Sequence, residues 1–369
     1  MSPGTEIQLI AAVTAAACAL PGVFLVLRRV TMLSDAISHA ILPGIVVAFF
    51  FTEDLASPLL LVSAAATGVL TVALIETLRR TGRVQEDAAI GLVSPVLFAI
   101  GVVLIAQFAS DVHLDVDAVL LGELAFAPFN RLAWGGADLG PVALWVMGTV
   151  LVLNALFLGL FYKELKLSTF DAGLAATLGF APTVLHYALM GLVSLTAVGA
   201  FDAVGSVLVV ALMVAPPATA YLLTDRLPVL LGLSAAIGAG AALAGYWAAR
   251  LLDTNIAGCM ATAAGLAFAL GFVFAPERGL VAQARRRVRN RRRFAQRMLT
   301  VHLLHHEGLP EADRECRVGH LQEHLRWDAD FARLAVGAAV DDGLARREGD
   351  RLFLTDAGRT DAQQAMVDG

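Results

Sequence analysis

One stretch decides the fold of this chain: Arg28-Arg29-Val30-Thr31-Met32-Leu33-Ser34-Asp35-Ala36-Ile37-Ser38-His39-Ala40-Ile41-Leu42-Pro43-Gly44, which runs on into the apolar residues 45–51. It begins a segment with the length and composition of a membrane span. The carboxylate of Asp35 and the imidazole of His39 are four residues apart, and on a helix this spacing places both on one face. Two interpretations stay open. The pair lies at a cytoplasmic helix end, solvated or hydrogen-bonded, or it faces a pore and binds a cation, as ionisable residues within membranes often do.

The composition of the whole chain is that of a membrane protein. Of the 369 residues, 58% are hydrophobic and only 16% are charged, and the mean hydropathy is +0.72. No ordinary soluble domain approaches this balance. The net charge of -5 hides an asymmetry, because most arginines follow residue 278. The three cysteines lie far apart in the sequence and indicate neither a disulfide framework nor a zinc site of the Cys-x-x-Cys type.

Nine segments are apolar and long enough to cross about 30 Å of hydrocarbon. They cover residues 7–27, 33–51, 57–78, 88–108, 141–161, 184–201, 204–223, 229–251 and 257–275. The predicted fold is therefore an all-α polytopic membrane protein. A count of eight or ten stays open, because the first segment is rich in alanine and the segments 184–201 and 204–223 are closely joined.

Basic residues at the ends of these segments predict the orientation. If the arginine-rich tail is cytoplasmic, the outer loops hold only Arg131 and Arg250. The inner loops then hold Arg28, Arg29, Arg79, Arg80, Arg83, Lys163, Lys166 and Arg226. Eight against two is a clear positive-inside bias, which places the N-terminus outside the cell and the tail in the cytoplasm.

The predicted inner loop 162–183 contains a short helix of its own. Thr169 or Asp171 can cap its start, Gly179 ends it, and Pro182 lies just beyond. A capped helix outside the bilayer is a natural docking element for a cytoplasmic protein. A plain amphipathic connector is the equally acceptable alternative.

The tail reads as a small soluble domain after a basic run. The arginines of residues 285–293 indicate contact with anionic lipid, with nucleic-acid binding as the minority interpretation. Helices are expected over residues 297–308, 318–327 and 330–343, followed by a hairpin with a Gly349-Asp350 turn and a last helix. This order is a winged-helix α+β pattern. The predicted divisions are 1–282 for the membrane domain, 283–296 for a basic juxtamembrane linker and 297–369 for a cytoplasmic winged-helix-like domain.

The tail also concentrates metal-binding residue types at helical spacing. These are His302, His306, Cys316, His320 and His324. Within each of the two groups, 302/306 and 316/320/324, neighbours are four residues apart and share a face if the segment is helical. A regulatory metal site is one interpretation, and solvent-facing histidines on short helices are the ordinary one.

The membrane part resembles the permease subunits of the manganese, zinc and iron ABC importers, the ABC-3 family. The resemblance covers roughly residues 5–282. It is carried by the 28–44 block, Leu121-Gly122-Glu123-Leu124, Phe170-Asp171 through Gly179, residues 204–216, and Pro276-Glu277-Arg278-Gly279-Leu280. The tail, through residues 341–358, resembles the winged-helix domains of iron- or manganese-dependent repressors.

The resemblance implies a type II ABC importer-like fold of about 8–9 transmembrane helices. Such permeases work as a pair, here a homodimer. They receive a divalent metal from an extracytoplasmic binding protein, and a cytoplasmic ABC ATPase dimer drives its passage. By resemblance, Asp35 and His39 hold the metal in transit. The residues that couple to the ATPase are Phe170, Asp171, Ala175 and Gly179.

The expected function is that of a metal-import permease in the cell membrane, with no permanently bound cofactor. A carboxylate with a neutral imidazole suits Mn²⁺, Zn²⁺ or Fe²⁺, and the repressor-like tail favours Mn²⁺ by association. The chain has no Walker motif, so ATP hydrolysis is assigned to another polypeptide and this chain is not an enzyme. The alternative is a membrane-tethered metal sensor or transcription regulator in which the spans serve only as an anchor.

Overall fold

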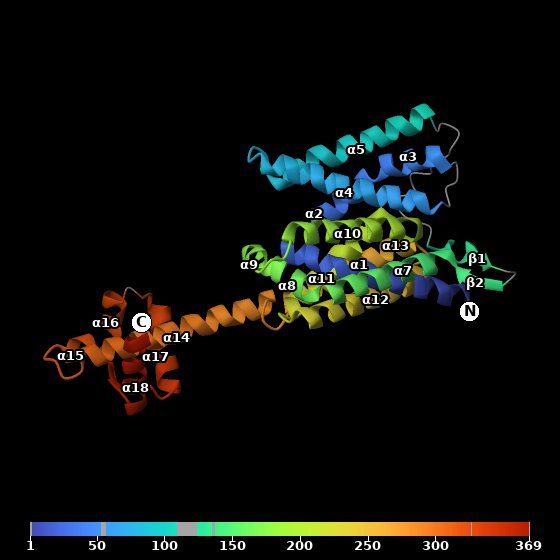
Figure 1. The fold of residues 1–369 in the computed structure, drawn as a ribbon. Helices are drawn as coiled ribbons and strands as arrows, with labels where there is room; N and C mark the ends of the chain where they lie inside the picture. Colours follow the sequence, from blue (N-terminus) through green and yellow to red (C-terminus); the bar gives the residue numbers. More distant parts are fainter. Residues whose placement is uncertain (1, 53–56, 109–123, 135–136, 326, 369) are drawn as a thin grey trace. The chain divides into compact units, whose positions relative to one another are not determined.

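The chain divides into two compact units, Met1–Arg278 and Gly279–Gly369 (Figure 1). A computed structural model describes residues 2–52, 57–108, 124–134, 137–325 and 327–368. The Leu121-Gly122-Glu123 part of the family motif lies outside the described residues.

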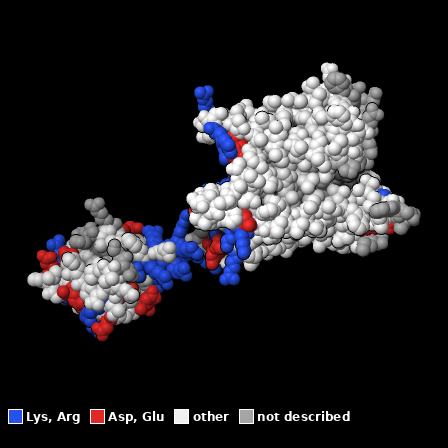
Figure 2. Space-filling model, viewed as in Figure 1, with Lys and Arg blue, Asp and Glu red and all other residues white. Residues whose placement is uncertain are grey.

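The first unit contains nine membrane-span candidates among its described residues, judged by length and composition. The prediction of nine is confirmed. The helices are α1 (Pro3–Arg28), α2 (Met32–Ala40) with α3 (Leu42–Thr52), α4 (Pro58–Arg80), α5 (Glu86–Phe108), α7 (Val142–Leu160), α10 (Pro182–Val204), α11 (Ser206–Leu223), α12 (Leu227–Leu252) and α13 (Ile256–Phe274). On the face drawn in Figure 2, Lys, Arg, Asp and Glu gather at the two ends of this unit and are almost absent from the broad flank between them. A flank of this kind fits the hydrocarbon core of a bilayer.

The span predicted as one segment over residues 33–51 is two helices in the structure. α2 ends at Ala40 and α3 begins at Leu42, with Ile41 between them. Pro43 explains the interruption, because proline has no N–H to donate and fits only the first turn of a helix. The amide of Gly44 donates to the carbonyl of Ile41 at 3.0 Å and so starts the new helix. Asp35 and His39 therefore lie on a short helix that ends one residue after His39.

Gly44 lets α3 approach α4 closely. The Ser63 hydroxyl of α4 donates to the Gly44 carbonyl at 2.7 Å. A Cβ added at Gly44 would lie 2.1 Å from Oγ1 of Thr67 and 2.7 Å from the carbonyl oxygen of Ser63. Small residues at such crossings are typical of helix packing in membranes.

We expect Gly44→Val to destabilise the membrane unit by about 1–3 kcal/mol, because the added side chain must push α3 away from α4. The free energy of unfolding in an SDS titration of the purified protein measures this. Gly148→Val is the matched control, since a Cβ at Gly148 has no neighbour within 4 Å. Equal stability of the two variants would contradict the close approach.

The core of the first unit is built around α1, which packs against α7, α10, α11 and α12. Most of its length is buried, including Phe24 and Leu25 near its end. A buried polar contact ties three helices together: the Asn154 amide donates to the Ala17 carbonyl at 2.8 Å and lies 3.0 Å from Oγ1 of Thr196. Hydrogen bonds of this kind between helices fix their register within a membrane.

The two closely joined segments are separate helices. α10 and α11 are connected by Gly205 alone, whose φ of +76° is a conformation that residues with a Cβ rarely adopt. This single residue turns the chain from one helix into the next.

At the end of the unit that holds the N-terminus, a small hairpin is fixed to α1 (Figure 1). Its strands are β1 (Arg131–Trp134) and β2 (Ala137–Pro141), preceded by the 3-10 turn η1 (Ala127–Phe129). Arg131 bridges Glu6 of α1 at 3.1 Å and Asp138 at 2.6 Å. The backbone amide of Gly140 and then the guanidinium of Arg131 hold the pKa of Asp138 below its usual value. The hairpin is thus stabilised by the ion pairs of Arg131 as well as by the backbone hydrogen bonds between its strands.

The second unit is a small domain of helices and one hairpin. It consists of α14 (Leu280–His306), α15 (Ala312–Glu315), α16 (Val318–His324), α17 (Ala329–Asp341), β3 (Ala345–Glu348), β4 (Arg351–Leu354) and α18 (Asp356–Asp368). Its core includes Leu299, Leu303, Leu321, Val336 and Leu352. The predicted helices and the hairpin with its Gly349-Asp350 turn are confirmed.

The basic run expected as a linker over residues 283–296 takes part in one continuous helix. α14 begins at Leu280, well before the start predicted at residue 297. Arginine is a good helix former and the run contains neither glycine nor proline, so nothing in it ends a helix.

Candidate functional site

Asp35 and His39 share the exposed face of α2. Asp35 has 53% of its side chain exposed and His39 has 44%. The other face of this short helix is buried in the unit through Leu33, Ser34, Ala36, Ile37, Ser38 and Ala40. The pair therefore points away from the body of the protomer although it belongs to a predicted span.

The two side chains lie next to each other. Nε2 of His39 is 3.5 Å from Oδ1 of Asp35, and the ring of His39 meets Phe98 of α5 edge-on with 6.3 Å between centroids. The helix beneath them is fixed by Ser94 of α5, whose hydroxyl donates to the Ala36 carbonyl at 3.2 Å. One carboxylate and one imidazole are thus presented together from a firmly held backbone.

These two side chains alone would not complete the coordination of a metal ion. A zinc or manganese ion takes four to six donors, whereas α2 offers the carboxylate of Asp35 and one ring nitrogen of His39. Ionisable groups within a span are costly when they face lipid and usually face a polar partner. The arrangement therefore fits a site completed by a second polar surface.

The short helix predicted between two spans is present as α9 (Ala172–Thr177), and a further helix, α8 (Tyr162–Phe170), precedes it. Of the two predicted caps, Asp171 makes the cap of α9: its Oδ1 accepts the amide of Leu174 at 2.8 Å. Gly179 follows the helix with a φ of +87°, as expected for a terminating glycine. Ala175 is buried and Phe170 is 66% exposed.

An apolar patch surrounds α9. Its members are the exposed side chains of Phe170, Leu174, Leu178 and Phe180, which we call the α9 patch. Exposed apolar patches often mark interaction sites.

Arg28 at the end of α1 connects this segment to the helix core. Its Nε donates to Oγ1 of Thr169 and its Nη2 to Oγ of Ser168, both at 3.1 Å. Its Nη1 lies 3.2 Å from Nδ1 of His186 in α10. Because arginine only donates, Nδ1 accepts and Nε2 of His186 carries the proton, 3.8 Å from Glu76 of α4. The guanidinium of Arg28 thus joins the end of α8 to α1 and α10. The end of α8 leads directly into the α9 patch.

Sequence reasoning took Arg28 only as a mark of topology and missed its partners. Ser168 and His186 are 140 and 158 residues away in the sequence, so no local spacing predicts these contacts. The signal available was that Glu76 and His186 are ionisable residues within predicted spans, which usually have a polar role.

We expect Arg28→Gln to lower the free energy of unfolding by about 3 kcal/mol, because several bonds to a charged group are lost and buried hydroxyls lose a donor. An SDS titration of the purified protein measures this. The neighbouring Arg29 is exposed, so Arg29→Gln is the matched control. A loss in Arg28→Gln no larger than in the control would show that the network contributes little.

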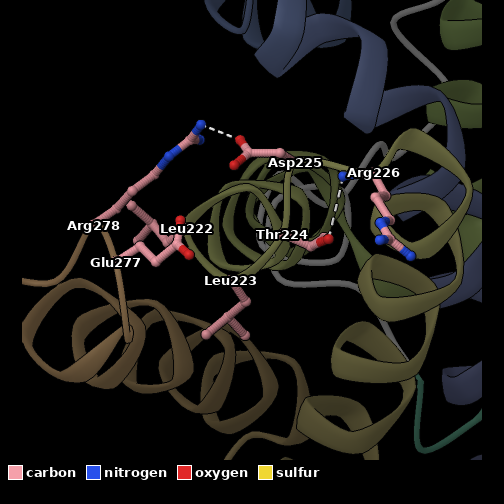
Figure 3. A pocket seen from close by; sticks show the side chains of 7 residues that line it. All are labelled: Leu222, Leu223, Thr224, Asp225, Arg226, Glu277 and Arg278. Carbon is pink, nitrogen blue, oxygen red and sulfur yellow. Dashed lines mark hydrogen bonds and ion pairs between the residues drawn. The ribbon is translucent and has the colours of Figure 1, made fainter.

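A surface hollow of the first unit lies at the turn between α11 and α12 (Figure 3). It is lined by residues 222–226, Glu277 and Arg278. Arg278 forms an ion pair with Asp225, donates to the Tyr221 carbonyl at 2.9 Å and stacks on the Tyr221 ring at 4.4 Å. These contacts fasten the chain leaving α13 to the α11–α12 turn, which is a structural role.

Part of the predicted histidine cluster comes together in the second unit. His302 and His306 of α14 and Glu315 of α15 each offer one donor atom, and these atoms lie within 4.8 Å of one another. Nε2 of His320 lies 2.8 Å from the Glu315 carboxylate. Glu315 was missed by sequence reasoning, because its position beside the histidines depends on the turn between α14 and α15.

Of the other two predicted ligands, Cys316 does not join this group. Cys316 is a buried free thiol outside the group of three, and burial raises its pKa above the usual value. A raised pKa disfavours the thiolate, which is the form that binds metals. The side chain of His324 lies outside the described residues.

A family model described as the ABC 3 transport family matches residues 5–275 of the chain, well over half of its length. The chain belongs to the ABC 3 transport family. It is similar to the zinc transport system membrane protein TroD of Treponema pallidum, with 46% identity over 361 residues covering 98% of both chains. It is also similar to the manganese transport system membrane protein MntD of Bacillus subtilis, with 48% identity over 266 residues covering 72% of this chain and 90% of that one.

Among solved structures, this ABC 3 protein resembles PsaBC of Streptococcus pneumoniae in complex with Fab. The TM-score is 0.62 at 27% identity, and the match covers 75% of this chain and 94% of that one. The predicted family and its transport class of function are confirmed. The relatives named here are transport-system proteins, so the alternative of a membrane-tethered regulator finds no support among them. The match with TroD covers nearly the whole chain and so includes the second unit.

Proposed function

We propose that this chain is the permease subunit of an ATP-driven importer of a divalent transition metal, with Asp35 and His39 binding the metal in transit. The observation that carries the proposal is the outward position of this pair on a membrane-span helix whose other face is buried. The relatives carry names of zinc and manganese transport systems. A carboxylate with an imidazole accommodates Mn²⁺, Zn²⁺ and Fe²⁺ alike.

The proposed working unit is a homodimer with the two α2 helices facing each other. Two copies supply two carboxylates and two imidazoles, enough for a four-coordinate ion that must also be released. The interruption of the span at Ile41 supports a transport site at this position, since interrupted helices are a common feature of transport sites in membranes.

The proposed ATPase contact is the α9 patch with its cap. Phe170 and Leu174 supply the apolar surface, Asp171 fixes the first turn, Ala175 packs inward and Gly179 ends the helix. ATP hydrolysis belongs to a separate ABC ATPase dimer, and the Arg28 network is the proposed connection from this contact to α1.

The proposed topology has the hairpin end outside the cell membrane and the α9 end in the cytoplasm. It follows from the basic residues of the predicted inner loops. An extracytoplasmic metal-binding protein would then deliver the ion at the hairpin end. The second unit is proposed to be a cytoplasmic winged-helix domain, and its order of helices, hairpin and helix supports this. Its proposed role is contact with other proteins and not with nucleic acid.

Reconstitution tests the proposed function. The chain is placed in proteoliposomes with its ATPase and binding protein, and uptake of radiolabelled Mn²⁺ and Zn²⁺ is measured with and without ATP. ATP-dependent uptake that survives removal of residues 285–369 is expected. Uptake that persists without the ATPase would instead indicate a carrier driven by an ion gradient.

A further inference from the structure

A cluster of side chains in the second unit has the chemistry of a metal site. His302 and His306 are one turn apart on α14, with ring centroids separated by 4.7 Å. Glu315 reaches them from the end of α15, and the three donor atoms lie within 4.8 Å of one another. Two ligands of one tetrahedral zinc ion lie roughly 3.4 Å apart. Small side-chain rotations therefore suffice to bring the three donors onto one ion.

One histidine of the cluster is held by the backbone. Nε2 of His302 lies 3.1 Å from the backbone carbonyl of Glu315. A carbonyl oxygen only accepts, so Nε2 carries the proton and Nδ1 keeps the lone pair that a metal needs. Ligating histidines commonly donate their second ring N–H to a carbonyl or carboxylate in this way.

The carboxylate of the cluster is held as well. His320 of α16 lies with Nε2 2.8 Å from Oε2 of Glu315. Both side chains are largely buried, with 14% of His320 and 12% of Glu315 exposed. A carboxylate that contacts a histidine through one oxygen can present the other to a cation, and supporting contacts of this kind are usual around bound metals.

We propose that the second unit binds one divalent transition-metal ion through His302, His306 and Glu315, with His320 positioning the carboxylate. Two imidazoles and one carboxylate form a nitrogen and oxygen donor set suited to Zn²⁺, Co²⁺, Mn²⁺ or Fe²⁺. None of these residues belongs to the membrane unit, so this site is additional to the proposed transport ligands. It gives the chain a means of responding to the ion class that it is proposed to carry.

The surroundings of the site indicate what the ion does. The ion would clamp the end of α14 to the end of α15 at Glu315. The next residue, Cys316, accepts the amide of Leu352 in β4 through its carbonyl at 2.9 Å, and Asp313 of α15 forms an ion pair with Arg351 of the same strand. An ion at Glu315 therefore fixes the joint between α14 and the hairpin, and metal binding stabilises the fold of this unit.

The test uses the full chain in lipid nanodiscs, with Asp35→Asn and His39→Gln present throughout to remove the proposed transport ligands. Co²⁺ is titrated and its visible d–d absorption is followed, with Zn²⁺ as competitor. The background protein is expected to bind one equivalent of Co²⁺. Adding His306→Gln or Glu315→Gln should weaken binding by about 100-fold or more. His305→Gln, an exposed neighbour on the same helix, should leave affinity and spectrum unchanged.

Melting of the second unit in EDTA, followed by circular dichroism, separates a lost ligand from a lost fold. The variants should melt with the background protein in EDTA, and only the background and His305→Gln proteins should gain stability with Zn²⁺. If His306→Gln melts early in EDTA and Glu315→Gln does not, the Co²⁺ affinity of Glu315→Gln decides whether the site exists. The proposal would be overturned if the background protein did not bind Co²⁺, or if both ligand variants bound Co²⁺ as tightly as the background protein. Neither result depends on transport.

Discussion

Replacing Asp35 by Asn and His39 by Gln together is expected to lower ATP-driven uptake of Mn²⁺ or Zn²⁺ by about 100-fold or more. Loss of a supporting residue around a metal typically costs 10–100-fold in affinity, and here the ligands themselves are removed. In a homodimer the change removes both copies of each ligand. Uptake of radiolabelled metal into proteoliposomes, at equal amounts of assembled transporter, measures the effect.

The control for this experiment is Met32→Ala, because Met32 is an exposed residue of the same short helix without metal-binding chemistry. Its uptake should match the parent. The amide replacements keep the size of both side chains, so assembly with the ATPase should be unaffected. Undiminished import by the double variant would remove the basis of the proposed pathway.

Phe170→Asp combined with Leu174→Asp is expected to weaken association with the ATPase by about 100-fold. Both side chains are exposed members of the α9 patch, and a carboxylate buried in an apolar contact must lose its hydration without a partner. Co-purification of the ATPase with the reconstituted chain and metal-stimulated ATP hydrolysis measure the loss.

Gln85→Asp is the matched control for this pair. Gln85 is exposed in the connection between α4 and α5, on the same predicted side of the membrane, and precedes the first turn of α5. The control variant adds one negative charge at a helix start, where a carboxylate is favourable. ATPase binding by the double variant at the level of this control would assign the α9 patch to lipid instead of the ATPase.

The features predicted correctly from sequence are those encoded within a few consecutive turns of chain. Nine apolar segments predicted nine spans, and Asp171 and Gly179 marked the limits of the short helix between two of them. Pro43 was a signal in the sequence for the interruption at Ile41, but the apolar residues on either side led to the prediction of one continuous span. Periodicity and capping are local signals, and they predicted local structure.

The features that were missed depend on contacts between distant parts of the chain. The partners of Arg28 come from two other helices, α8 and α10, and Glu315 reaches His302 and His306 only because the chain turns back after α14. Cys316 had the right spacing for a ligand, yet it is buried outside the group. Spacing shows which residues share a helix face, but the tertiary fold decides what that face meets.

The exposed position of Asp35 and His39 has a consequence for biogenesis. Each copy of the chain carries half of the donors that the proposed site requires. A single subunit newly inserted in the bilayer would therefore hold an ion too weakly to pass it on, and a route for the ion would arise only when two subunits meet. Pairing itself would then protect the cell from metal leakage before the ATPase takes control.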